Sequence, residues 1–283
     1  MKQAYLVNGL RTAIGNFGGS LSTIRTDDLA AFVLNQLMKK NSTVDFSQVG
    51  EVIMGCANQA GEDNRNIARM AILLAGLPIT IPGQTVNRLC ASGLSAAIDA
   101  ARAIQVGDEH LMIAAGVENM TRGPLILSKA VAAYGRDQQL HDSSFGWRFI
   151  NPKMKETYGV DAMGETAENV AEKYQINRTD QDAFAYWSQQ KYFKAQENKR
   201  FEKEIVAINI PQKNGAPLIF DKDEFAKSKT SLEGLAALKP AFKKEGSVTA
   251  GNSSGLNDGA AALLFASEEG LKQHHLEPLA RIV

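Results

Sequence analysis

Excess charge of one sign, cysteine and long hydrophobic runs are all scarce in this sequence, and each scarcity excludes a class of protein. The 283 residues hold 31 Lys and Arg against 31 Asp and Glu, so the formal net charge is zero and no basic surface for nucleic acid or an anionic membrane is expected. Two cysteines cannot build a disulfide framework, and their spacing is not that of a zinc site. No apolar run is long enough to span a bilayer, and the N-terminus lacks the pattern of a signal peptide. We therefore expect a cytoplasmic protein without a nucleic acid or membrane partner.

The sequence does contain an alternation of strand-like and helix-like segments. Apolar stretches predict strands, and apolar residues at helical spacing predict helices: strands at 51–57, 83–89 and 110–116, and helices at 26–40, 64–74 and 92–105. Strands that alternate with helices of this length favour a doubly wound, parallel α/β sheet.

After residue 120 the sequence becomes irregular and then mostly helical. We predict helices at 165–174 and 180–196, a hairpin of strands at 204–211 and 217–223, a strand at 261–267, and a short helix with a strand start up to 283. The length suits about two domains. The predicted regions are an N-terminal α/β domain at 1–120, a loop domain at 121–246, and a return to the first domain at 247–283, where a second α/β domain also starts.

Cys90 lies at a junction, in the stretch VNRLCASG between a predicted strand and a predicted helix. Ligands bind at the carboxyl ends of strands in open α/β sheets, and a helix N-terminus favours a thiolate and an oxyanion beside it. The small residues Ala91, Ser92 and Gly93 leave room for an acyl group. A buried structural role fits the position of Cys90 equally well. Cys56, inside a predicted strand, is expected to be a core residue.

No other pattern predicts a cofactor or a metal. The glycine-rich segment 251–259 lacks the Gly-Lys-Ser/Thr of a phosphate-binding loop and the GxGxxG of a dinucleotide fold. Asp258 has no His or second carboxylate at ligand spacing, so we expect no metal site. Glu118 is expected to be solvated or salt-bridged rather than catalytic, and His274 and His275 are expected to form a solvated surface pair.

Three segments resemble the thiolases, the enzymes that cleave or form 3-oxoacyl-CoA. The N-terminal strand and loop of that family resemble RTAIGNFGGSLS, its nucleophile segment resembles NRLCASGLSAAIDAARAIQVGDEHLMIAAGVENMTRGP, and its coenzyme A-side segment resembles GNSSGLNDGAAALLFAS. The similarity runs along the whole chain and its motifs occur in the family's order. It implies a thiolase-like α/β fold with a mostly helical loop domain.

The resemblance also implies an activity, coenzyme A-dependent acyl transfer, with Cys90 as the nucleophile that becomes acylated. It places five residues against coenzyme A: Met163, Lys227, Phe242, Ala250 and Ser254. Coenzyme A is a co-substrate in this scheme, and no cofactor is covalently bound. The full-length form is expected to be a homodimer or homotetramer. The alternative is an inactive thiolase fragment or scaffold that binds coenzyme A without turnover.

The substrate class follows from a finer resemblance. GCANQAGEDNRNIARMA and GWRFINPKM are most similar to 3-oxoadipyl-CoA thiolases of aromatic-compound degradation. Ala162 departs from the His that acetoacetyl-CoA thiolases carry at that position. Arg148 is the candidate for binding the distal carboxylate of such a substrate, because Arg pairs with a carboxylate bidentately; a surface or structural Arg is the alternative.

Three motifs that the resemblance implies are missing. Thiolases carry a base in Gly-His-Pro, a second cysteine in Cys-x-Gly and an oxyanion-site residue in Asn-Glu-Ala-Phe, and none of these occurs in the 283 residues. The four histidines, His110, His141, His274 and His275, match none of them. The chain resembles a thiolase truncated before its C-terminal catalytic motifs, and we expect it to be inactive alone.

Overall fold

The computed structural model describes residues 2–283, which divide into two compact units. The first unit holds the chain up to Gly123 with Glu202–Asp223 and Asn257–Val283, and the second holds Pro124–Phe201 and Glu224–Leu256. The predicted loop domain, 121–246, therefore differs from the second unit at its start, where residues 121–123 belong to the first unit, and in two further places. Residues 202–223 belong to the first unit because they add a strand to its sheet, and residues 247–256 belong to the second.

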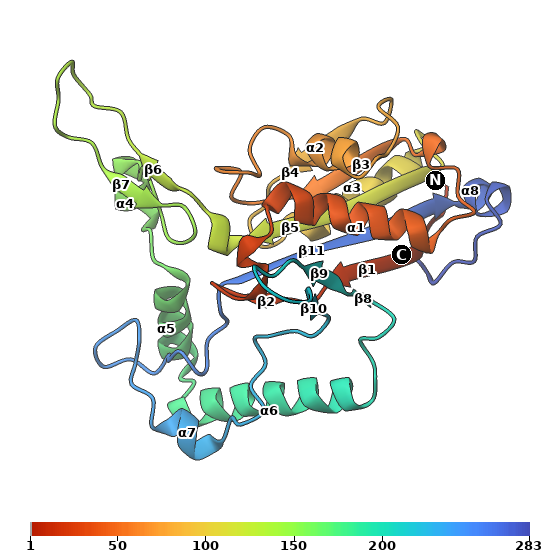
Figure 1. The fold of residues 1–283 in the computed structure, drawn as a ribbon. Helices are drawn as coiled ribbons and strands as arrows, with labels where there is room; N and C mark the ends of the chain where they lie inside the picture. Colours follow the sequence, from red (N-terminus) through yellow and green to blue (C-terminus); the bar gives the residue numbers. More distant parts are fainter. Residues whose placement is uncertain (1) are drawn as a thin grey trace. The chain divides into compact units, whose positions relative to one another are not determined.

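A mixed sheet forms the centre of the first unit, in the strand order β12-β1-β11-β5-β3-β4. Its strands are β1 (Ala4–Thr12), β3 (Glu51–Gly55), β4 (Gly83–Val86), β5 (Leu111–Asn119), β11 (Asn257–Ser267) and β12 (Ala280–Arg281). Two short strands are added beside them, β2 (Gly15–Asn16) on β11 and β8 (Ile205–Val206) on β1. Figure 1 shows β11, in blue, lying between β1 and β5, far from both in sequence.

The sheet is doubly wound as predicted, but it is parallel only in part. Strand β3 pairs in parallel with both β4 and β5, whereas β11 is antiparallel to both β5 and β1. The expectation of a parallel sheet is therefore wrong for the pairs that β11 forms with β5 and β1, and for the pair of β1 with β12. Alternating strands and helices encode only the parallel β3, β4 and β5. The direction of β11 depends on the path of the chain through the second unit. Strand β12, predicted as the start of a second α/β domain, pairs with β1 of the same sheet.

Helices cover the two faces of this sheet: α1 (Thr26–Lys40) and α2 (Ile67–Leu74) on one, and α3 (Ser92–Val106) on the other. Side chains on a strand alternate between faces. On β5, Ile113 is accordingly buried with α1 and α2, whereas Met112 and Ala114 are buried with α3. Helix α3 packs through the small residues Ala96 and Ala100, which let it lie close to the strands.

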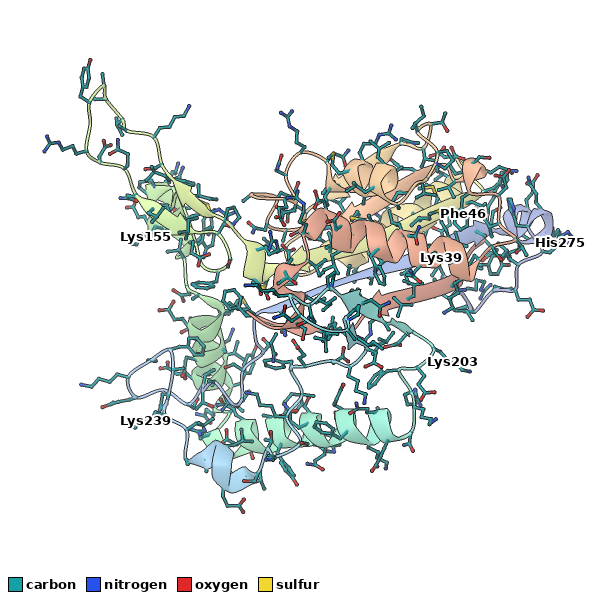
Figure 2. The ribbon with its side chains drawn as sticks, in the orientation of Figure 1. Lys39, Phe46, Lys155, Lys203, Lys239 and His275 are labelled. Atoms are coloured by element: carbon teal, nitrogen blue, oxygen red, sulfur yellow. The ribbon has the colours of Figure 1, made fainter. Side chains whose placement is uncertain are left out.

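The rest of the first unit consists of short elements: η1 (Ser20–Thr23), η2 (Phe46–Gln48), η3 (Met120–Arg122), α8 (Glu268–Gln273) and the hairpin β9 (Ile208–Ile210) and β10 (Leu218–Phe220). The predicted hairpin is confirmed, since β9 and β10 pair antiparallel and Gly215 has a φ of +95° in their connection. The predicted surface pair is wrong for His274, which is buried at the end of α8. The chain turns back there to pair β12 with β1. His275 is exposed (Figure 2).

The second unit is mostly helical. It contains α4 (Pro152–Tyr158), α5 (Met163–Tyr174), α6 (Arg178–Glu197), α7 (Leu232–Ala236) and the two-stranded sheet of β6 (Leu125–Leu127) and β7 (Leu140–Asp142). The two predicted helices are confirmed as α5 and α6. The side chain of Asn177 begins α6 by accepting a hydrogen bond from the Asp180 N–H at 2.9 Å. No helix in residues 2–283 is long and apolar enough to cross a membrane.

Candidate active site

Cys90 lies between β4 and α3, one residue before the Ala91 that precedes the first turn of α3. The predicted junction of strand and helix is therefore confirmed, although the strand ends at Val86 rather than at residue 89. Residues 87–91 form an exposed turn, and Cys90 is an exposed free thiol. Cys90 is thus not a core residue, and a substrate can reach its sulfur from solvent.

Two side chains hold the backbone of this turn. The Ser92 hydroxyl donates to the Leu89 carbonyl at 2.5 Å and accepts from the Arg88 N–H at 2.8 Å. The Asn87 side-chain oxygen accepts from the Leu89 N–H at 2.9 Å. Leu89 has a φ of +50°, in the left-handed region that residues other than glycine rarely adopt. The residue before the candidate nucleophile is therefore held in a costly conformation by its neighbours.

The first turn of α3 rests directly on strand backbone. A Cβ atom added to Gly55 of β3 would lie 2.3 Å from the carbonyl carbon of Ser92 and 2.4 Å from the nitrogen of Gly93. One added to Gly116 of β5 would lie 3.6 Å from the Cα of Gly93. Gly55 therefore sets how closely the helix approaches the sheet. Gly55 is not among the residues predicted from the sequence, although a glycine inside an apolar strand is a known signal of close backbone approach.

Cys56 provides the contrast with Cys90. Its side chain is 1% exposed and belongs to the hydrophobic core, and its sulfur donates to Asp63 Oδ2 at 3.6 Å. Burial raises the pKa of the Cys56 thiol, and the nearby Glu118 and Asp63 carboxylates raise it further. The prediction that Cys56 is a core residue is confirmed, and its thiol is disfavoured as a nucleophile.

Glu118 and Asp63 are structural acids rather than solvated ones. Glu118 on β5 is half-buried and accepts the N–H groups of Ala57 and Asn58 at 2.9 and 3.2 Å. Burial raises its pKa, although these two hydrogen bonds act in the opposite direction. The expectation that Glu118 is solvated or salt-bridged is therefore wrong. A carboxylate in a strand has the same residue type whether it faces solvent or a neighbouring loop, so the sequence carries no signal for this role.

Potential metal ligands do gather at this place, because ligand atoms of Cys56, Asp63 and Glu118 lie within 4.8 Å of one another. Both carboxylates already accept backbone N–H groups of the segment 57–61. The two carboxylates therefore hold the segment that follows β3, and this structural role explains why they lie together. Asp258 is also buried, and it accepts two hydrogen bonds from Thr121.

The five residues that the thiolase resemblance places against coenzyme A all belong to the second unit. Each has an exposed side chain: Met163, Lys227, Phe242, Ala250 and Ser254. Met163 begins α5 and is 77% exposed, and the ring of Phe242 lies against the backbone of the next residue, Gly164. Met163 and Phe242 thus present neighbouring apolar surface to solvent. Such surface is suited to the chain of an acyl carrier.

The segment that carries Ala250 and Ser254 is held by buried acids. Glu168 of α5 is 5% exposed and accepts from the Ser247 and Val248 N–H groups at 2.8 to 3.0 Å and from the Ser247 hydroxyl at 3.2 Å. Burial raises the pKa of Glu168, but these hydrogen bonds outweigh it, and the net pKa is lowered. Glu168 therefore remains a carboxylate at neutral pH and fixes the start of this segment.

A second acid, Asp182 of α6, completes the support. It is 4% exposed, pairs with Arg178 at 2.7 Å and accepts the Asn252 amide at 2.9 Å. The Asn252 oxygen in turn accepts the Thr249 N–H at 2.7 Å. Glu168 and Asp182 are not among the residues predicted from the sequence, because charged residues on helices give no signal of burial. Arg148, the candidate for a substrate carboxylate, also lies in the second unit, where its guanidinium donates to the Ser143 carbonyl at 3.4 Å.

Comparisons with known proteins agree on one family. The family described as "Thiolase, N-terminal domain" matches residues 4–269. The chain is 54% identical to a beta-ketoadipyl-CoA thiolase of Acinetobacter baylyi, covering 100% of this chain and 71% of that protein. It is 51% identical to the 3-oxoadipyl-CoA/3-oxo-5,6-dehydrosuberyl-CoA thiolase of Escherichia coli, with the same coverage of 100% and 71%.

Solved structures give the same result. The acetyl-CoA acetyltransferase of Bacillus anthracis matches with a TM-score of 0.87 at 40% identity, over 100% of this chain and 70% of that chain. Human mitochondrial 3-ketoacyl-CoA thiolase in complex with CoA matches with a TM-score of 0.89 at 34% identity, over 100% of this chain and 69% of that chain. The thiolase-like fold expected from the sequence is confirmed.

Proposed function

Because this chain belongs to the thiolase family, a family of acyltransferases, we propose that Cys90 is the nucleophile in the coenzyme A-dependent cleavage of a 3-oxoacyl-CoA. The observation that carries the proposal is the contrast between the two thiols. Cys90 is exposed beside the N-terminus of α3, whereas Cys56 is buried beside two carboxylates. The sulfur of Cys90 is accessible to a substrate, whereas burial and the nearby carboxylates disfavour the reactive thiolate form of Cys56.

The proposed reaction has two steps. The Cys90 thiolate attacks the 3-oxo carbonyl, and the bond between carbons 2 and 3 breaks. The two-carbon fragment leaves as the enolate of acetyl-CoA and takes up a proton, while the shortened acyl group stays on the sulfur as a thioester. The thiol of a second coenzyme A then loses its proton and takes the acyl group, which frees Cys90. The positive end of the α3 dipole stabilises negative charge at the attacked carbonyl.

Coenzyme A binding is proposed for the second unit. Met163 and Phe242 would contact the apolar part of the pantetheine chain, and Ala250 and Ser254 would line it from the segment that Glu168 and Asp182 hold. Lys227 would lie near the phosphates of the nucleotide as a point charge, without the two-pronged geometry of an arginine. The exposure of all five side chains supports this assignment, as does the CoA complex of the human relative.

The proposed substrate is 3-oxoadipyl-CoA, supported by the names of relatives that are 51% to 54% identical to the chain over its 283 residues. A second candidate function, coenzyme A binding without turnover, is favoured by one observation. The Gly-His-Pro, Cys-x-Gly and Asn-Glu-Ala-Phe motifs do not occur in the 283 residues. The proposal therefore assigns to this chain the nucleophile and the coenzyme A contacts, and no acid or base.

The test is mass-spectrometric mapping of the two cysteines after brief treatment of the folded chain with iodoacetamide at neutral pH. Cys90 should be labelled and Cys56 should stay protected. A Cys56→Ser variant should keep the labelling of Cys90, and Cys90→Ser should abolish labelling. Incubation with an acyl-CoA should add the acyl mass to the Cys90 peptide alone. Equal labelling, or labelling of Cys56 first, would overturn the assignment of Cys90.

A further inference from the structure

A chain of hydrogen bonds connects the central strand β5 to the turn that carries Cys90. It begins at Glu118, whose two carboxylate oxygens accept the N–H groups of Ala57 and Asn58 just after β3. Glu118 thereby fixes the peptide that contains the Ala57 carbonyl. That carbonyl accepts the side-chain amide of Asn87 at 3.0 Å. The turn is thus attached to a point that the sheet itself holds in place.

Asn87 uses both ends of its amide. Its nitrogen donates to Ala57, and its oxygen accepts the N–H of Leu89, the residue before Cys90. The orientation of the amide is therefore determined, because only a nitrogen can donate to a carbonyl and only an oxygen can accept an N–H. One side chain joins the end of β3 to the backbone of the nucleophile turn.

These side-chain bonds add to two backbone hydrogen bonds within the turn, from the Ala91 and Ser92 N–H groups to the Arg88 and Leu89 carbonyls at 3.1 and 3.0 Å. Residues 87–91 are all exposed, so no packed side chain of theirs fixes the conformation. Leu89 has a φ of +50°, which a residue with a Cβ atom adopts only under constraint. The Asn87 and Ser92 bonds are the side-chain constraints on this backbone. When the bond to Leu89 is removed, the turn can relax to an ordinary φ and carry Cys90 away from α3.

We propose that Asn87 is a positioning residue for Cys90, which holds the thiol beside the N-terminus of α3 through the Leu89 N–H and anchors the turn through the Ala57 carbonyl. This inference rests on the proposed function, since it assumes that Cys90 is the nucleophile. Asn87 takes no part in bond making or breaking. Its effect is to keep the attacking sulfur in one place.

The experiment measures the rate of Cys90 alkylation by iodoacetamide in the 283-residue chain and in two variants. Asn87→Ala removes both bonds. In Asn87→Ser, the hydroxyl can still accept the Leu89 N–H, as serine commonly does in turns. The shorter side chain cannot reach the Ala57 carbonyl. The matched control is Asn209→Ala, an exposed asparagine in β9. Protection of Cys56 serves as the check that the fold is intact, because Cys56 is 1% exposed.

We expect Asn87→Ala to slow alkylation of Cys90 by about fivefold to tenfold. The free energy of one hydrogen bond changes the ratio of two turn conformers by about this factor. Access cannot offset this loss, because Cys90 is already exposed. Asn87→Ser should regain at least half of the lost rate, and Asn209→Ala should react as wild type. The same order should hold for acylation by an acyl-CoA.

Two results would overturn the inference. An Asn87→Ala rate within about twofold of wild type, less than one such bond contributes, would show that the turn does not need Asn87. Asn87 would have only a general structural role if Cys56 lost its protection in both Asn87 variants. The same conclusion would follow if Cys90 were alkylated no faster in Asn87→Ser than in Asn87→Ala. Failure of the proposed function looks different: wild-type Cys90 itself would then show no preference over Cys56.

Discussion

Gly55 and Gly116 allow a direct test of how the sheet positions the nucleophile turn. They are paired residues on the neighbouring parallel strands β3 and β5. A Cβ atom at Gly55 would lie 2.3 to 2.6 Å from backbone atoms of Ser92 and Gly93, whereas one at Gly116 would find its nearest neighbours at 3.6 Å. The same substitution, Gly→Ala, therefore causes overlap at one position and ordinary contact at the other.

The magnitudes follow from these distances. Gly55→Ala must move the first turn of α3 by about 1 Å to restore a normal carbon–carbon contact, and overpacking of this kind costs about 1–3 kcal/mol in the free energy of unfolding. Backbone atoms form the obstacle, so no side chain can rotate to relieve it. Gly116→Ala should be neutral or stabilise by about 0.4–1 kcal/mol, because alanine restricts the unfolded chain. The free energies of unfolding of the two variants should therefore differ by about 1–4 kcal/mol.

The assay is urea denaturation in which unfolding of the first unit is followed by pulse labelling of Cys56, a thiol reachable only when that unit opens. The alkylation rate of Cys90 is measured in parallel without urea. Gly55→Ala should lower the urea midpoint and change the Cys90 rate, and Gly116→Ala should do neither. Equal midpoints and unchanged Cys90 rates in both variants would refute the idea that contact between α3 and the Gly55 backbone positions the turn.

Three further predictions concern the second unit and turnover. Hydrogen bonding lowers the net pKa of Glu168, so the stability that this carboxylate contributes is fully present above its unfolded pKa, about 4.3, and is lost as the pH falls through the lower folded pKa. Glu168→Gln should therefore remove this part of the acid dependence of the free energy of unfolding. An unchanged acid dependence in the variant would contradict the prediction. Phe242→Ala and Lys227→Gln should each weaken coenzyme A binding in calorimetry, Lys227→Gln by about fivefold or less because an exposed ion pair is worth at most about 1 kcal/mol; binding equal to wild type in both would remove these residues from the site. The 283-residue chain alone should show no more than trace thioester cleavage beside the Acinetobacter baylyi relative, because each missing acid or base contributes about 10²- to 10⁴-fold; activity within about tenfold of that relative would show that the missing motifs are not needed.

Much of the first unit could be predicted from the sequence, because the relevant signals are local. Apolar alternation and helical spacing each depend on a few neighbouring residues, so β3, α3 and β5 were found near their observed bounds. The same local pattern placed Cys90 at a junction and Cys56 in the core, although β3 ends at Gly55, one residue before Cys56. The long motifs shared with the thiolases identified the family. These features needed no knowledge of which distant segments meet.

Tertiary structure decided what depends on distant segments. The antiparallel insertion of β11 between β1 and β5 follows from the path of the chain after the second unit, which no local period encodes. Burial of Glu168 and His274, and partial burial of Glu118, are determined by the segments folded over them, and a carboxylate or imidazole has the same residue type when it is exposed. The sequence alone thus determined which thiol is the candidate nucleophile. The constraints on its position arise from backbone and hydrogen-bond contacts that exist only after β3, β5 and α3 have come together.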